Sequence, residues 1–117
     1  MADQDRRHPD LAPCRFRALD ASDAIVLDSK GADVLVVDPP RKGLCGPVLE
    51  ALTTASSGTP TTSLSRLIYI SCGFDAFQHD LNALLKSKRW ALVDAEAHVL
   101  FPGSDHVETL AVFDAVR

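Results

Sequence analysis

Three clusters of polar residues stand where apolar runs of this 117-residue chain meet loops, and each carries a side chain capable of chemistry. The first, Asp38-Pro39-Pro40-Arg41-Lys42-Gly43, follows the run Val34 to Val37. The second is Ser71-Cys72-Gly73, and the third runs from Phe101 to Thr109 and contains a histidine and a glutamate. Carboxylates, cations and a thiol are the groups that proteins use for acid–base and nucleophilic chemistry.

The first cluster follows a predicted buried strand. The run Val34 to Val37 has no polar alternation, which is typical of a central parallel strand covered on both faces. Pro39 and Pro40 have no backbone N–H, so we expect the strand to stop at Asp38. Ligands bind beyond the carboxyl ends of strands in open α/β sheets. A site is therefore expected at this strand end, although Asp38 taken alone also suits the cap of a turn.

The rest of the chain predicts strands and helices in alternation. Strands are expected at 14–19, 66–71, 90–99 and 106–116, and helices at 24–30, 47–54 and 76–88, the last capped by Asp75. This order indicates an α/β fold, a partial Rossmann-like sheet that is mostly parallel with an antiparallel strand near its end. No opening strand leads into a Gly-rich turn, so the sequence resembles the C-terminal half of a larger domain.

Length and composition predict one domain at 14–117, after a polar, disordered lead-in at 1–13. The Thr/Ser/Gly/Pro tract 53–65 is expected to be a flexible surface loop. A formal charge of −4 requires any nucleic-acid contact to be local. Three widely spaced cysteines form neither a disulfide framework nor a zinc cluster, and no apolar run has transmembrane length. We expect an intracellular, cytoplasmic protein with no membrane partner and no metal, with an organelle left open.

Each chemical residue has an ordinary explanation when it is taken alone. Cysteine is among the most buried residue types, so Cys72 also suits a packing role. Glu108 alone would be an exposed charge on an edge strand, and His106 a loop histidine. Arg41 and Lys42 equally suit solvated loop cations. The combination, rather than any single residue, therefore carries the prediction.

In order and spacing, the clusters resemble the motifs of the RNA uracil-5-methyltransferase family from about residue 16 to 116. That family has Asp-Pro-Pro-Arg-x-Gly, matched at 38–43, and Tyr-x-Ser-Cys-Asn-Pro, matched at 69–72 and then replaced by Gly73-Phe74. An Arg-Asp-Leu-like stretch is matched by His79-Asp80-Leu81, and Phe-Pro-x-x-x-His-Val-Glu by residues 101–108. Rival methyltransferases with an aromatic residue or a cysteine directly after the prolines fit less well, since Arg41 stands there.

The resemblance implies the C-terminal half of a class I methyltransferase sheet, and S-adenosylmethionine-dependent methylation of uridine C5 in tRNA or rRNA. It implies that Cys72 is the nucleophile, Glu108 the proton acceptor, and Asp38 a contact to the cofactor or the target base. A thiolate that adds at C6 makes C5 nucleophilic, and a base must then remove the C5 proton. The target uridine must leave its stack, so a flipped base is expected.

Further contacts are implied less directly. Pro39, Arg41, Lys42 and His106 are expected to contact the RNA substrate. Asp20, at the end of the first expected strand, lies where such domains often place a residue near the adenine of the cofactor.

The family's Gly-rich cofactor loop and ribose-binding acidic residue have no match, so this chain alone is expected to be inactive or nearly so. The alternative function is a non-catalytic α/β module that acts through an exposed sheet edge, by homodimerisation or by pairing with a missing half.

Overall fold

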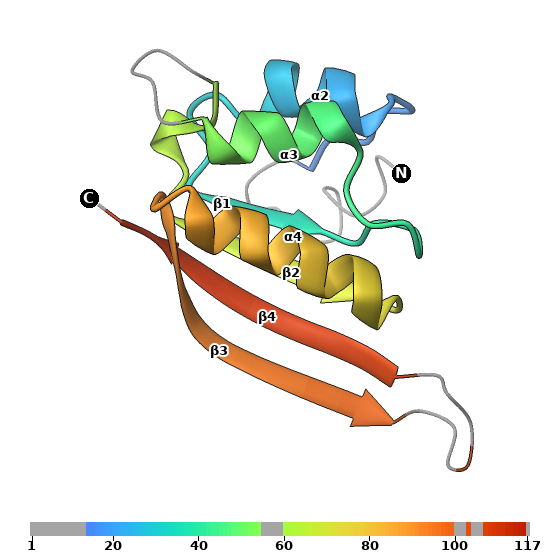
Figure 1. The fold of residues 1–117 in the computed structure, drawn as a ribbon. Coiled ribbons are helices and arrows are strands. Elements are labelled where there is room, and N and C mark those ends of the chain that lie inside the picture. Colours follow the sequence, from blue (N-terminus) through green and yellow to red (C-terminus); the bar gives the residue numbers. More distant parts are fainter. Residues whose placement is uncertain (1–13, 55–59, 100–102, 104–106, 117) are drawn as a thin grey trace.

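The computed structural model describes residues 14–54, 60–99, 103 and 107–116, and the statements below concern these ranges. Figure 1 shows three α-helices and one 3₁₀-helix (η1) with four strands. In chain order the elements are α2 (Ala21–Asp28), β1 (Val34–Val37), α3 (Gly46–Thr53), η1 (Pro60–Ser63), β2 (Arg66–Ser71), α4 (Phe74–Lys86), β3 (Trp90–Val99) and β4 (Val107–Ala115).

The four strands form one sheet in the order β1-β2-β4-β3. β1 and β2 are parallel, and β4 is antiparallel to both of its neighbours, β2 and β3. Three strands therefore run in one direction and only β4 opposes them. The predicted α/β class, with one antiparallel strand near the end of the chain, is confirmed, as are the strands at 66–71 and 90–99.

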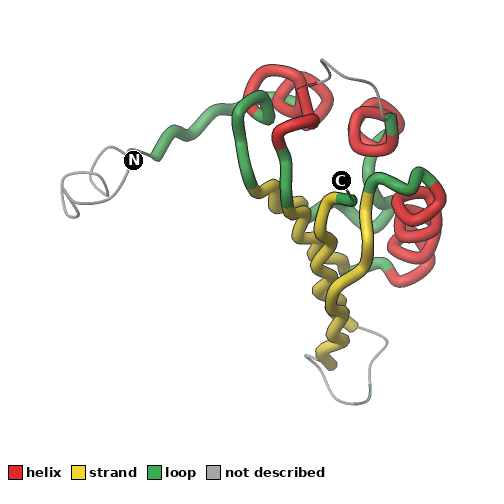
Figure 2. Tube along the Cα trace, turned by 90° about the vertical axis from the view of Figure 1, so that its left-hand side faces the viewer, coloured by secondary structure: helices red, strands yellow, loops and turns green. Residues whose placement is uncertain are grey.

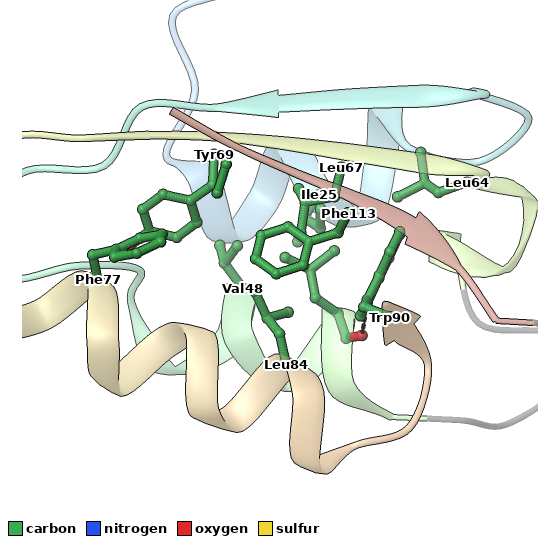
Figure 3. Close-up of a cluster of buried hydrophobic side chains, with 11 residues drawn as sticks. Ile25, Val48, Leu64, Leu67, Tyr69, Phe77, Leu84, Trp90 and Phe113 are labelled. Carbon is green, nitrogen blue, oxygen red and sulfur yellow. Dashed lines mark hydrogen bonds between the residues drawn. The ribbon is translucent and has the colours of Figure 1, made fainter. Parts of the chain in front are cut away.

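The helices lie on one side of the sheet, and both Figure 1 and Figure 2 show this arrangement. Alternate residues of the central strands point toward them, so Tyr69 from β2 and Phe113 from β4 are fully buried. Phe77 of α4 packs edge-on against Tyr69, with ring centroids 5.4 Å apart. Trp90 lies at the other end of the core, where its indole N–H donates to the carbonyl of Leu52 at 2.8 Å (Figure 3). The sheet is thus held by a single core on its helical face.

β1 is an edge strand, which corrects the prediction of a central strand covered on both faces. It pairs only with β2, and its outward side chains Val34 and Val36 are 49% and 56% exposed. The described helices cover the opposite face, toward which Leu35 and Val37 point. The apolar run therefore predicted the strand correctly, but not its place in the sheet.

The predicted strand at 14–19 is also wrong. This segment is extended but joins no described strand, and Arg17 instead forms an ion pair with Asp28 of α2, at 3.1 Å. α2 starts at Ala21 rather than residue 24, because the extended backbone of Asp20 already serves as its N-cap. α4 likewise starts at Phe74, so Asp75 lies in the first turn instead of capping it. A carboxylate there still favours the helix through the macrodipole.

The prediction of a flexible surface loop at 53–65 is wrong for residues 60–64, which the structure describes. Pro60–Ser63 form η1, and both Thr61 and Leu64 are buried in the core. Thr61 is tolerated there because its hydroxyl donates to the carbonyl of Ala51 at 2.8 Å and accepts from Arg89 at 3.1 Å. Residues 55–59 and the lead-in at 1–13 lie outside the described residues.

Candidate active site

The topology brings the three polar clusters to one rim of the sheet. Asp38 follows the carboxyl end of β1, and Cys72 follows the carboxyl end of β2. Because β4 runs antiparallel to β2, its amino end, which carries Glu108, lies at this same rim. Of the third cluster, Gly103 and residues 107–109 are described, whereas His106 lies outside the described residues.

The register of β2 and β4 brings the nucleophile candidate and the base candidate to the same end of these two strands. Ser71 of β2 pairs with Thr109 of β4, and both side chains point into the core. Cys72 directly follows Ser71 and Glu108 directly precedes Thr109, so this last printed pair places both residues at the same rim of the sheet. Both side chains are half-buried, so neither is sealed from a ligand at the rim.

A short turn fixes the backbone around Cys72. The Ser71 hydroxyl accepts from the N–H of Gly73 at 3.1 Å and lies 3.0 Å from its carbonyl. None of the three cysteines forms a disulfide, and Cys72 is the least exposed of them. The thiol is therefore held at a defined place on the rim, by a side chain that is itself buried.

Gly73 is packed directly against the loop that carries the first cluster. A Cβ atom on residue 73 would lie 2.5 Å from the carbonyl oxygen of Arg41 and 3.2 Å from its Cα. Such a distance is far inside van der Waals contact, so only glycine fits without a shift of the backbone. Gly73, which stands where the resembling motif has asparagine, thus allows the two loops to touch here.

An open groove of about 760 Å³ runs beside the rim, between α2, β1 and the start of α3. Its walls are mostly apolar and include the exposed face of β1. Five residues of the first cluster also line it: Asp38, Pro39, Pro40, Lys42 and Gly43. The exposed Asp38 carboxylate thus stands at the mouth of an apolar groove.

Two further predicted contacts lie differently. Arg41 is exposed, and its backbone faces Gly73 rather than the groove. Asp20 is exposed at the start of α2, and its carbonyl accepts from Asp23 and Ala24 N–H groups at 3.0 and 2.9 Å. Asp20 does not line the groove, although the next residue, Ala21, does.

Sequence reasoning assigned no role to Asp80, which the structure places beneath the first cluster. Its carboxylate is buried and accepts from the Tyr69 hydroxyl at 2.5 Å and from the Leu44 N–H at 2.8 Å. Burial, followed by the hydrogen bond to Asp80, raises the pKa of Tyr69 strongly, so the phenol stays protonated and donates. The His79-Asp80-Leu81 match was the only sequence signal, and it did not reveal these partners.

In the described ranges, no three His, Cys, Asp or Glu side chains are grouped so that they could hold a metal ion. No helix within those ranges is long and apolar enough to cross a membrane.

No family model matches this chain, but individual proteins do. It is 44% identical over 85 residues to an uncharacterized RNA methyltransferase of Protochlamydia amoebophila, covering 73% of this chain and 20% of that protein. It is 35% identical over 85 residues to the 23S rRNA (uracil(1939)-C(5))-methyltransferase RlmD of Xanthomonas oryzae, covering 73% of this chain and 17% of that enzyme. The chain thus spans about a fifth of the length of these relatives.

A solved structure matches as well. The tRNA (uracil-54, C5)-methyltransferase of Pyrococcus abyssi, in complex with S-adenosyl-L-homocysteine, superposes with a TM-score of 0.55 at 30% identity. The match covers 72% of this chain and 19% of that one. The resemblance inferred from the three motifs is thereby confirmed: over the segment it shares with them, the chain belongs to the RNA uracil-C5-methyltransferases.

Proposed function

We propose that this chain supplies the catalytic rim of an enzyme that methylates uridine C5 in RNA. The observation that carries the proposal is that the last paired residues of β2 and β4, Ser71 and Thr109, are the direct neighbours of Cys72 and Glu108, at the rim where Asp38 also lies. The named relatives act on uracil C5 of rRNA and tRNA, which supports this substrate class. Because the chain spans about a fifth of those enzymes, the complete activity needs parts that they contain and this segment does not match.

Cys72 and Glu108 divide the chemistry between them. The Cys72 thiolate adds to C6 of the uracil ring, forming a C–S bond and pushing electron density onto C5, which becomes nucleophilic. Once C5 is substituted, Glu108 takes the proton from C5, the electron pair restores the C5–C6 double bond, and the sulfur leaves. Both residues stand beside C6 and C5 only if the target uridine is flipped from its stack, which we propose as the bound form.

The cofactor proposed for this site is S-adenosylmethionine, which when bound supplies an electrophilic methyl group. The residues present fit it, because an exposed carboxylate at the mouth of an apolar groove suits a ligand with a cationic centre. Asp38 would contact the cationic part of the ligand or the target base, and Asp20 would lie toward its adenine. The groove is open along β1, so this chain is proposed to hold only part of the cofactor.

RNA would be held by the first cluster. Lys42 and Arg41 are exposed cations suited to phosphate, and Pro39 lies between them and Asp38. His106 is proposed as a fourth contact from the β3–β4 loop.

The absence of disulfides in the three cysteines fits the reducing, intracellular location expected from the sequence.

Calorimetric titration of S-adenosylmethionine into this chain tests the cofactor assignment, with Asp38→Ala as the variant and Asp114→Ala as an exposed-carboxylate control on the far end of β4. Binding that is lost only in Asp38→Ala supports a functional half-pocket. Tight binding that Asp38→Ala leaves unchanged contradicts the role of Asp38.

A pairing role is the second candidate, and one observation favours it. Among the described strands none covers the outer edge of β1, where Val34 and Val36 are about half exposed. An apolar, unpaired edge invites another strand, either from a second copy or from a missing half of the domain. Light scattering over a range of concentrations tests the homodimer, and a strict monomer at all of them argues against it.

A further inference from the structure

We propose that Asp80 is a positioning residue that fixes the first-cluster loop, residues 38–44, against α4 and so sets where Asp38 stands relative to Cys72. Its catalytic consequence rests on the proposed function, but its structural content does not. The proposal uses a buried carboxylate that the chemistry described above leaves without a role.

Asp80 holds the end of this loop through a single oxygen. The residue is 2% exposed, and its Oδ2 accepts both the Leu44 N–H, at 2.8 Å, and the Tyr69 hydroxyl, at 2.5 Å. A buried carboxylate needs such donors, and hydrogen bonds to a charged group are stronger than those between neutral groups. One donor comes from the loop and the other from β2, and Asp80 itself lies in α4, so one atom joins three elements.

The loop is shaped to reach that oxygen. Gly43 has φ of +88°, and a Cβ atom there would lie 2.7 Å from Asp80 Oδ2 and 3.1 Å from the Cβ of Ala76. The Gly43 N–H also donates to the carbonyl of Pro40 at 2.9 Å, which closes a turn just before Leu44. Glycine thus lets the backbone lie flat on the buried carboxylate.

The same loop touches the neighbour of the nucleophile. The carbonyl of Arg41 abuts Gly73, whose N–H in turn is bound by the Ser71 hydroxyl. A loop held by Asp80 at Leu44 therefore bears on the turn that contains Cys72. Loosening it at Leu44 should free both Asp38 and the backbone beside Cys72.

Native-state hydrogen exchange of the Leu44 amide tests the clamp in this chain without any ligand. In Asp80→Ala we expect Leu44 to exchange at least tenfold faster relative to Leu67, a fully buried residue of β2, whereas replacement of the exposed Gln78 on α4 by alanine leaves the ratio unchanged. Tyr69→Phe should keep the Leu44 protection within about threefold, because the carboxylate remains. If Asp80→Ala unfolds, Asp80→Leu, which removes both acceptor oxygens but fills the space, gives the same comparison.

An increase of Leu44 exchange only in step with Leu67 would mean a general loss of stability and would overturn the proposal. In an enzyme completed with the cofactor-binding part, Asp80→Asn should lower kcat/KM for S-adenosylmethionine at least fivefold while Gln78→Ala does not. If no variant, wild type included, methylates RNA, the proposed function fails, whereas the exchange result still decides the clamp.

Discussion

Replacing Gly73 by alanine measures how tightly the two rim loops are packed. The added Cβ would meet the Arg41 carbonyl oxygen at 2.5 Å, about 0.9 Å closer than ordinary van der Waals contact begins. Backbone lies on both sides of this contact, so no flexible side chain can swing away. Overpacking of this kind costs about 1–3 kcal/mol, and the smaller entropy of alanine in the unfolded chain returns about 0.4–1 kcal/mol. We expect a net loss of about 1–2 kcal/mol.

Two other glycines provide matched controls. Gly46, the first residue of α3, has nothing within 4 Å of an added Cβ, so Gly46→Ala should stabilise the chain by about 0.5–1 kcal/mol. Gly31 also faces open space but has φ of +82°, so Gly31→Ala isolates backbone strain, which costs about 1–2 kcal/mol. Gly73→Ala thus tests a steric clash, Gly31→Ala tests backbone strain, and Gly46→Ala introduces neither.

Urea unfolding followed by tryptophan fluorescence is the assay, because Trp90 is the only tryptophan and is 2% exposed in the core. The free energy of unfolding and its dependence on urea are obtained from the same curves. If Gly73→Ala is as stable as the wild type while Gly46→Ala behaves as expected, the loops do not touch in solution. The account of the rim would then be wrong at its closest contact.

Two further predictions concern ionisable groups, and a third concerns Arg89, a half-buried cation. Tyr69 is the only tyrosine, and its pKa is raised above its ordinary value of 10. The contribution of Tyr69 to the free energy of unfolding is therefore complete below pH 10 and is lost as the pH rises above that value. Phenolate absorbance that appears near pH 10 in the folded protein would refute this prediction. The hydrogen bond from Arg66 lowers the pKa of Asp114 from its ordinary value of 3.8. The ion pair therefore stabilises the fold above that pH, and its stabilisation decreases as the pH falls below it. Carboxyl NMR of Arg66→Ala should show that the pKa of Asp114 rises. Arg89 donates to the carbonyls of the last turn of α3 and to Thr61, so Arg89→Gln should cost about 2 kcal/mol in urea unfolding, and a loss below about 0.5 kcal/mol would contradict those bonds.

The local elements followed from local sequence. The apolar runs at 34–37 and 67–70 predicted strands because such runs suit the inside of a sheet, and the first strand ends at Val37, one residue before the expected end at Asp38. The spacing of Phe77, Leu81 and Leu84 predicted α4, whose buried face they form, although Leu85 lies on the exposed side. The antiparallel direction of the last strand was also expected. This direction brings the start of β4 to the same rim as the ends of β1 and β2.

The remaining features depend on contacts between distant parts of the chain. The apolar run of β1 matches a strand covered on both faces, and nothing in it reveals that the described segments cover only one. Residues 14–19 alternate like a strand but join none of the strands in the part of the chain that the structure describes. The bond from Leu44 to Asp80 spans 36 positions, and the contact of Gly73 with Arg41 joins two loops. Pattern and propensity carry no information about such pairings.

The central claim is that Cys72 attacks uracil, and covalent trapping tests it most directly. This segment would replace the matched 85 residues of the Xanthomonas RlmD, and the chimera would be incubated with S-adenosylmethionine and RNA containing 5-fluorouridine. Fluorine at C5 cannot be removed as a proton, so the adduct should persist, joined through Cys72. We predict an adduct in Cys45→Ser and none in Cys72→Ser. A chimera that binds S-adenosylmethionine yet forms no adduct, or forms one without Cys72, would contradict the assignment.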